Sequence, residues 1–65
     1  MRANLKKARL DNNLTQQQVA TALGITVNAY QKLEYGKRIG KIESWDKLED
    51  LLQVNQRVLR EISPD

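Results

Sequence analysis

Two helix starts on either side of a single turn glycine constrain the fold of this chain more than any other feature of its sequence. Thr15 and Gln18 match a capping box, in which the threonine hydroxyl accepts a hydrogen bond from the backbone N–H three residues later and the glutamine side chain reaches back. Gly24 stands where a helix can end in the left-handed region without a Cβ penalty. Thr26 is the next favourable N-cap. The sequence therefore predicts two short helices joined by a tight turn.

Apolar residues at helical spacing extend this pattern over the rest of the chain, and no segment shows the alternation typical of a strand. The expected caps and stops are Asn12, Asn13, Gly36, Ser44, Asn55, Ser63 and Pro64. The expected helices span residues 2–12, 16–23, 27–35, 45–53 and 56–62. A chain of 65 residues has no room for a second core. We therefore predict an all-α fold, a compact five-helix bundle that forms a single domain over residues 1–65.

The composition excludes most kinds of reactive site. The chain has no cysteine and no histidine, which removes disulfides, thiolate or imidazole metal sites and imidazole-dependent triads. The stretch 36–41 lacks the spacing and the Ser or Thr of a phosphate-binding P-loop. No apolar run approaches the roughly 20 residues that cross a bilayer, and no signal-peptide core follows Met1. We expect no enzyme, metal, cofactor, small-molecule ligand or membrane association, and a cytoplasmic location.

Charge is divided unevenly along the chain. Residues 1–41 carry eight basic and two acidic side chains, a net charge of +6, whereas residues 42–65 carry a net charge of −3. Such polarity indicates that the first part of the chain meets a polyanion. A charge imbalance on an ordinary solvated surface would give the same pattern.

The segment from Thr15 to Gly36, TQQQVATALGITVNAYQKLEYG, resembles the helix-turn-helix of the lambdoid phage repressor and Cro family, also called the Xre family. Two helices that cross through a tight turn need a small residue at their contact and apolar residues that fix both to the core. The residues that meet these needs are Val19, Ala20, Leu23, Ile25, Tyr30 and Leu33. The resemblance extends from Leu5 to Asn55. Tyr30 differs from the Ile or Val usual in the family, Asn13 replaces its usual Gly, and the loop 36–44 lacks its common Pro.

Two charged residues, Arg9 and Glu34, fall on otherwise apolar helix faces, where an unpaired charge is costly. We therefore expect them to pair, as an arginine of the first helix and a glutamate after the recognition helix commonly do in the resembled family. The alternative is two exposed charges. Trp45 is in register with the apolar residues of the fourth helix, so we expect it in the core rather than stacked on a base.

The resemblance implies that the helix 27–35 enters the major groove of DNA. Its expected base-contacting residues are Val27, Asn28, Gln31 and Lys32. Asparagine can pair with adenine, lysine with guanine, and valine can pack on a thymine methyl group. The expected phosphate-contacting residues are Gln16, Thr26, Tyr35, Lys37, Arg38 and Lys41. The open alternative is that these are ordinary solvated helix and loop positions.

From these features we expect a prokaryotic or phage transcriptional regulator, of the repressor or Cro type, that binds operator DNA and associates with the nucleoid. One recognition helix reads few base pairs, so we expect a homodimer on DNA. Members of the resembled family often dimerise through the region of their fourth and fifth helices, which implies an interface formed by Val54, Val58, Leu59 and Ile62. These residues could equally close the small core, and the chain could be monomeric without DNA or part of a longer regulator. The alternative function is a protein-interaction module of the antitoxin or anti-repressor type.

Overall fold

Helices are the only regular structure in the computed structural model, which describes residues 1–63. The five helices are α1 Ala3–Asp11, α2 Gln16–Leu23, α3 Val27–Glu34, α4 Ile42–Leu52 and α5 Gln56–Arg60. The predicted all-α, five-helix architecture is therefore confirmed. The predicted stop at Pro64 lies outside the described residues.

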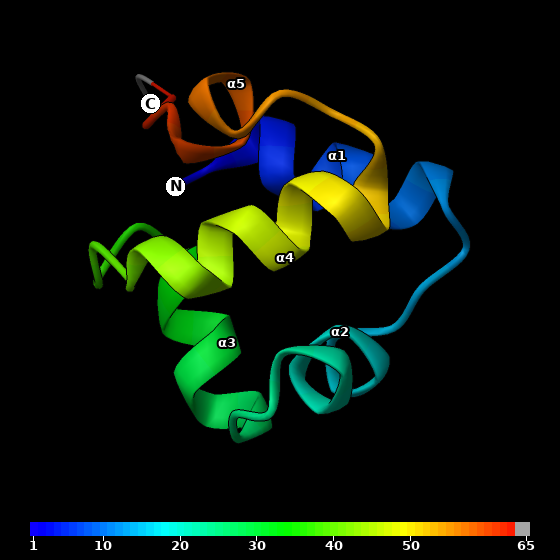
Figure 1. Cartoon of the computed structure of the whole chain (residues 1–65). Coiled ribbons are helices and arrows are strands. Elements are labelled where there is room, and N and C mark those ends of the chain that lie inside the picture. Colours follow the sequence, from blue (N-terminus) through cyan, green and yellow to red (C-terminus); the bar gives the residue numbers. More distant parts are fainter. Residues whose placement is uncertain (64–65) are drawn as a thin grey trace.

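The helices form two groups on either side of α4 (Figure 1). On one side α2 and α3 pack against each other, and on the other α1 and α5 lie together, with α5 also packed on α4. The backbone N–H of Ser63 donates to the carbonyl oxygen of Met1 at 2.8 Å, so the two ends of the described chain lie side by side. This arrangement leaves α2 and α3 at one end of the molecule.

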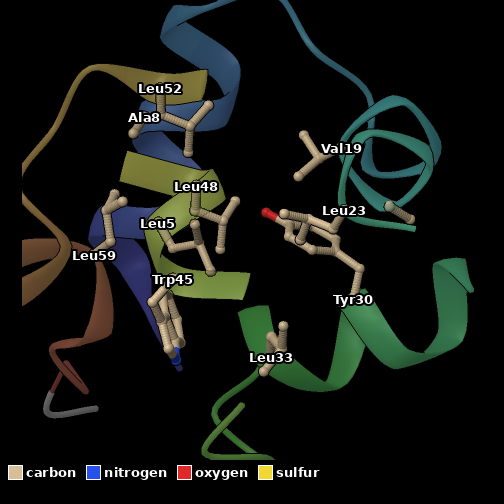
Figure 2. Close-up of a cluster of buried hydrophobic side chains, with 11 residues drawn as sticks. Leu5, Ala8, Val19, Leu23, Tyr30, Leu33, Trp45, Leu48, Leu52 and Leu59 are labelled. Atoms are coloured by element: carbon tan, nitrogen blue, oxygen red, sulfur yellow. The ribbon is translucent and has the colours of Figure 1, made fainter. Parts of the chain in front are cut away.

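The core lies between these two groups and is drawn in Figure 2. Its buried apolar residues are Leu5, Ala8, Val19, Ala20, Leu23, Tyr30, Leu33, Trp45, Leu48, Leu52 and Leu59. Every helix contributes at least one of them. The side chain of Trp45 is only 1% exposed, which confirms its predicted place in the core.

The predicted local signals around α2 and α3 are confirmed. The Thr15 hydroxyl accepts from the Gln18 backbone N–H at 3.1 Å, and the Thr15 backbone N–H donates to the Gln18 side chain at 2.8 Å. Gly24 has a φ of 73°, in the left-handed region. The Thr26 hydroxyl accepts from the backbone N–H of Ala29 and caps α3. The capping box and the second cap therefore fix where both helices begin.

Two other predicted caps are also present. Asn13 takes a left-handed φ of 58° after α1 ends, as expected of an asparagine stop. The Asn55 side chain accepts from the backbone N–H of Arg57 and caps α5. These signals act within a few residues along the chain, which is why the sequence reveals them.

Some predicted helix ends were wrong by one or two residues. α1 is one residue shorter than expected at each end, and α3 ends at Glu34 with Tyr35 as its C-cap. α5 ends two residues early, at Arg60. The reason at α5 is that the backbone of Glu61 is extended, with ψ at 129°, which carries Ser63 to its hydrogen bond with Met1.

The predicted start of the fourth helix was wrong by three residues, since α4 begins at Ile42 and Ser44 lies inside its first turn. Lys41 occupies the N-cap position without a side-chain hydrogen bond. The indole N–H of Trp45 donates to the carbonyl oxygen of Ile39 at 2.8 Å. This bond holds the preceding loop against the core, and the chain therefore enters the helix earlier than a serine cap would require.

Candidate nucleic-acid interface

Helix α3 has one face in the core and an opposite face open to solvent. Tyr30, Leu33 and Glu34 are buried, and they recur at the three- and four-residue spacing of one helix face. Asn28 and Lys32 are exposed and lie one helical turn apart. The structure thus brings two of the expected base-contacting side chains together on the open face of α3.

The other two expected base-contacting residues are less open. Val27 is partly buried and packs against the core cluster. Gln31 is also half-buried, and its side-chain amide donates to the Gln16 side-chain oxygen at 3.1 Å. Both side chains therefore have contacts within the protein that the sequence did not reveal.

A buried ion pair fixes α3 to α1. Arg9 Nε donates to Glu34 Oε2 at 3.0 Å, and Arg9 Nη2 donates to Glu34 Oε1 at 3.1 Å. Both side chains are buried, and Arg9 Nη1 also donates to the carbonyl oxygen of Leu14 at 2.9 Å. The hydrogen bond with Glu34 raises the pKa of the Arg9 guanidinium. Since a bidentate pair has a defined geometry, it sets the orientation of the last turn of α3.

The ion pair continues into a hydrogen-bonded chain on the surface. The Gln16 side-chain nitrogen donates to Glu34 Oε1 at 3.4 Å, and the Gln16 side-chain oxygen accepts from Gln31. Gln16 is the first residue of α2, so this chain of side chains links all three N-terminal helices. Spacing in the sequence could not reveal it, because the residues meet only when α2 packs across α3.

The expected phosphate-contacting residues lie at the start of α2, at the two ends of α3 and in the loop that follows it. Thr26 is exposed and its hydroxyl accepts from Ala29, which leaves the hydroxyl hydrogen free to donate. Tyr35 is 49% exposed at the end of α3. The three loop cations are exposed and form no ion pair with a described residue: Lys37, Arg38 and Lys41. Of the charges in residues 15–41, four are basic and one, Glu34, is a buried acid neutralised by Arg9.

Arg2 is also a basic residue of the first part of the chain, but it is not one of these exposed cations. It is 5% exposed. Its Nη1 donates to the carbonyl oxygens of Leu33 at 2.6 Å and Arg38 at 2.7 Å. Its Nε donates to the carbonyl oxygen of Arg60 at 3.1 Å. The guanidinium also lies 5.1 Å from the ring centre of Trp45. Arg2 therefore holds the loop that carries the exposed cations. No signal in the sequence marks it, because a basic residue near the start of a chain is usually a surface charge.

The residues expected at a dimer interface divide into two groups. Leu59 is fully buried between the helices, where its side chain closes the core, which is the alternative expected for these residues. Val54 is partly buried against the same core. Val58 and Ile62 are 41% and 52% exposed and remain on the surface.

Residues 1–63 hold neither a cluster of metal ligands nor a membrane-spanning helix. No three histidine, cysteine, aspartate or glutamate side chains come together as metal ligands in this range. No helix in it has the length and apolar character that crossing a membrane requires.

The amino-acid sequence also matches a known protein family. A family model described as helix-turn-helix, of the Xre and lambda Cro type, matches residues 5–55, which is most of the chain. No curated protein and no solved structure matches the chain.

Proposed function

Since this chain belongs to the helix-turn-helix family of the Xre and lambda Cro type, we propose that it recognises a specific operator by inserting α3 into the major groove. Membership makes it a DNA-binding transcription-regulator domain. The proposal adds the reading helix, the contacting residues and a role like that of a phage repressor or Cro protein. Such a role would bring the protein to the nucleoid in the cytoplasm.

The observation that carries the proposal is the open face of α3, where Asn28 and Lys32 are exposed while the opposite face is held by the core and the Arg9–Glu34 pair. A rigid helix with free amide and ammonium groups one turn apart suits the major groove, where asparagine can recognise adenine and lysine can recognise guanine. Val27 offers part of its side chain to a thymine methyl group beside them.

Contacts to phosphates would fix the register of α3. Gln16 and Thr26 lie at the starts of α2 and α3, where the helix dipole is positive. Tyr35, Lys37, Arg38 and Lys41 follow α3 on the exposed loop. Because phosphate contacts carry no base identity, these residues would contribute affinity to all sequences alike.

The size of the protein favours binding as a homodimer. Its longest extent is 28 Å. Successive half-sites on one face of DNA lie about 34 Å apart, so one copy cannot place α3 in both. Val58 and Ile62 offer exposed apolar side chains for a second copy.

The test begins with selection of bound sequences from a random duplex pool, followed by titration of the selected site at two salt concentrations. We expect a short palindromic site. Asn28→Ala should lose about 1–3 kcal/mol at one position of the site, whereas Lys37→Ala should weaken all sequences alike and reduce the salt dependence. Lys47→Ala is the matched control, because Lys47 is an exposed lysine of α4, outside the proposed contact surface.

Failure of the selection would favour the other candidate function, a protein-interaction module. One observation supports that candidate: Ile39, in the loop after α3, and Ile42, at the start of α4, are 85% and 74% exposed. If no sequence is enriched and all binding is weak and strongly salt-dependent, α3 does not read bases. Capture of a partner protein that is lost on Ile39→Ser, with DNA binding unchanged, would then support the second function.

A further inference from the structure

We propose that Gln31 is a positioning residue that holds Gln16 ready for a DNA phosphate, and that it does not read bases. The inference rests on the proposed DNA-binding function and assigns separate tasks to neighbouring residues of α3. Asn28 and Lys32 face solvent, whereas Gln31 is half-buried and its amide points to α2.

The direction of each hydrogen bond follows from the buried ion pair. The Glu34 carboxylate paired with Arg9 can only accept hydrogen bonds. The Gln16 amide therefore turns its nitrogen toward Glu34, at 3.4 Å. Its oxygen then faces away from the carboxylate, where it accepts from the Gln31 nitrogen at 3.1 Å. The opposite orientation of Gln16 would bring two oxygens together at Glu34 and two nitrogens together at Gln31.

This orientation leaves Gln16 with a donor for DNA. A glutamine amide has two N–H groups, and Glu34 takes one of them. The second remains for a phosphate oxygen beside the start of α2. Because both ends of the Gln16 amide are held before DNA arrives, less side-chain freedom is lost on binding.

The Gln31 amide, in contrast, already uses an N–H group for a bond within the protein. Its donated hydrogen bond is directed at Gln16, so turning the amide toward a base edge would break the bond that orients Gln16. Positioning Gln16 and reading a base are therefore competing tasks for this N–H group. The half-buried place of Gln31 beside α2 favours the first task.

The test compares Gln31→Met, Gln16→Met and the double variant on the selected operator, on operators with single base changes and on unrelated duplex DNA. Methionine keeps the length of the side chain and removes the amide. We expect Gln31→Met to weaken binding about three- to tenfold on every sequence, the effect of one hydrogen bond. The double variant should bind no more weakly than Gln16→Met alone, because both changes remove the same contact. The salt dependence should stay constant, since no charge is removed.

Gln17→Met is the matched control and should leave binding unchanged, because among residues 1–63 the Gln17 amide donates only to Thr21 of its own helix. Three results would overturn the inference: a changed base preference at one operator position, effects of the two single variants that multiply, or no effect of Gln31→Met. A wild-type protein that selects no operator would instead overturn the proposed function, and the inference with it.

A second measurement does not depend on the stability of any variant. NMR of the wild-type protein should show the Gln31 side-chain amide in contact with Gln16 both in the free state and on the operator. Contact with a base in place of Gln16 would refute the positioning role.

Discussion

Replacing Tyr30 with phenylalanine removes a single oxygen atom from the centre of the core. The ring of Tyr30 is fully buried, and Figure 2 shows it reaching from α3 into the core with its hydroxyl directed toward Leu48. That hydroxyl lies near the buried Arg9–Glu34 pair but has no hydrogen-bond partner among residues 1–63. The resembled family usually has an aliphatic residue here, so the hydroxyl is an addition that the fold does not require.

The expected magnitude follows from the lost hydration of that hydroxyl. Data from protein variants put the cost of burying such a group without a partner at about 1–3 kcal/mol. Removing one oxygen leaves almost no cavity and keeps the ring contacts. We therefore expect Tyr30→Phe to raise the free energy of unfolding at pH 7 by about 1 kcal/mol, which raises the Tm of a domain this small by about 4–8 °C.

The effect should grow in alkaline solution. Burial raises the pKa of Tyr30 above its ordinary value of 10.0, and the nearby Glu34 carboxylate adds to the shift. Above pH 10 the unfolded chain therefore releases a proton that the folded protein keeps, and the wild-type protein loses stability as the pH rises. The loss from this group should be about 1.4 kcal/mol at pH 11. Phenylalanine cannot ionise, so the advantage of Tyr30→Phe should widen by that amount.

Urea unfolding followed by circular dichroism at pH 7 and pH 11 measures both effects. Tyr35→Phe is the matched control, because Tyr35 is 49% exposed and should leave stability unchanged at both pH values. A loss of 1 kcal/mol or more in Tyr30→Phe at pH 7 would refute the reasoning, since it would mean that the hydroxyl makes a stabilising hydrogen bond.

Three other changes test the contacts that orient α3 and its loop. Glu34→Gln leaves the Arg9 guanidinium buried without a carboxylate, so urea titrations should show a free energy of unfolding that is lower by about 3–5 kcal/mol. A loss below about 1 kcal/mol would show that the ion pair contributes little to stability. Arg2→Lys replaces a planar group that donates to three carbonyl oxygens with a single ammonium group, so backbone hydrogen exchange in residues 37–40 should speed up. Unchanged exchange would contradict the conclusion that Arg2 holds this loop. Gly40→Ala places a Cβ 2.8 Å from two core side chains at a φ of +82°, and should lower Tm more than Gly24→Ala, which meets open space at a φ of +73°. Equal losses of Tm in the two glycine variants would mean that the close contacts relax freely.

The buried polar contacts have a consequence for binding as well as for stability. Arg2 holds the loop of cations and the Arg9–Glu34 pair holds α3, so both parts of the proposed contact surface are attached to the core by arginines. A bound conformation that is already formed loses less freedom on binding. Changes at these buried residues should therefore weaken DNA binding even though none of them touches DNA.

The sequence by itself determined the parts of this protein that depend on neighbouring residues. The capping box of α2, the cap of α3 and the turn at Gly24 each involve atoms within about four residues of one another, so their residue types identify them directly. The apolar spacing likewise separated the buried face of α3 from the face that carries Asn28 and Lys32. Charges placed on apolar faces were enough to suggest a link between Arg9 and Glu34.

Only the tertiary structure decided the contacts between residues that are distant along the chain. Arg2 bonds to carbonyl oxygens 31 to 58 residues away, and a backbone carbonyl leaves no signature in the sequence. The start of α4 depends on Trp45 and the loop before it, and Leu59 is buried only because α5 packs on α1 and α4. The bond between Gln16 and Gln31 likewise exists only because α2 crosses α3. Local signals fix where α2 and α3 begin, but which polar groups are buried depends on how the helices pack, because packing excludes the water that would otherwise satisfy them.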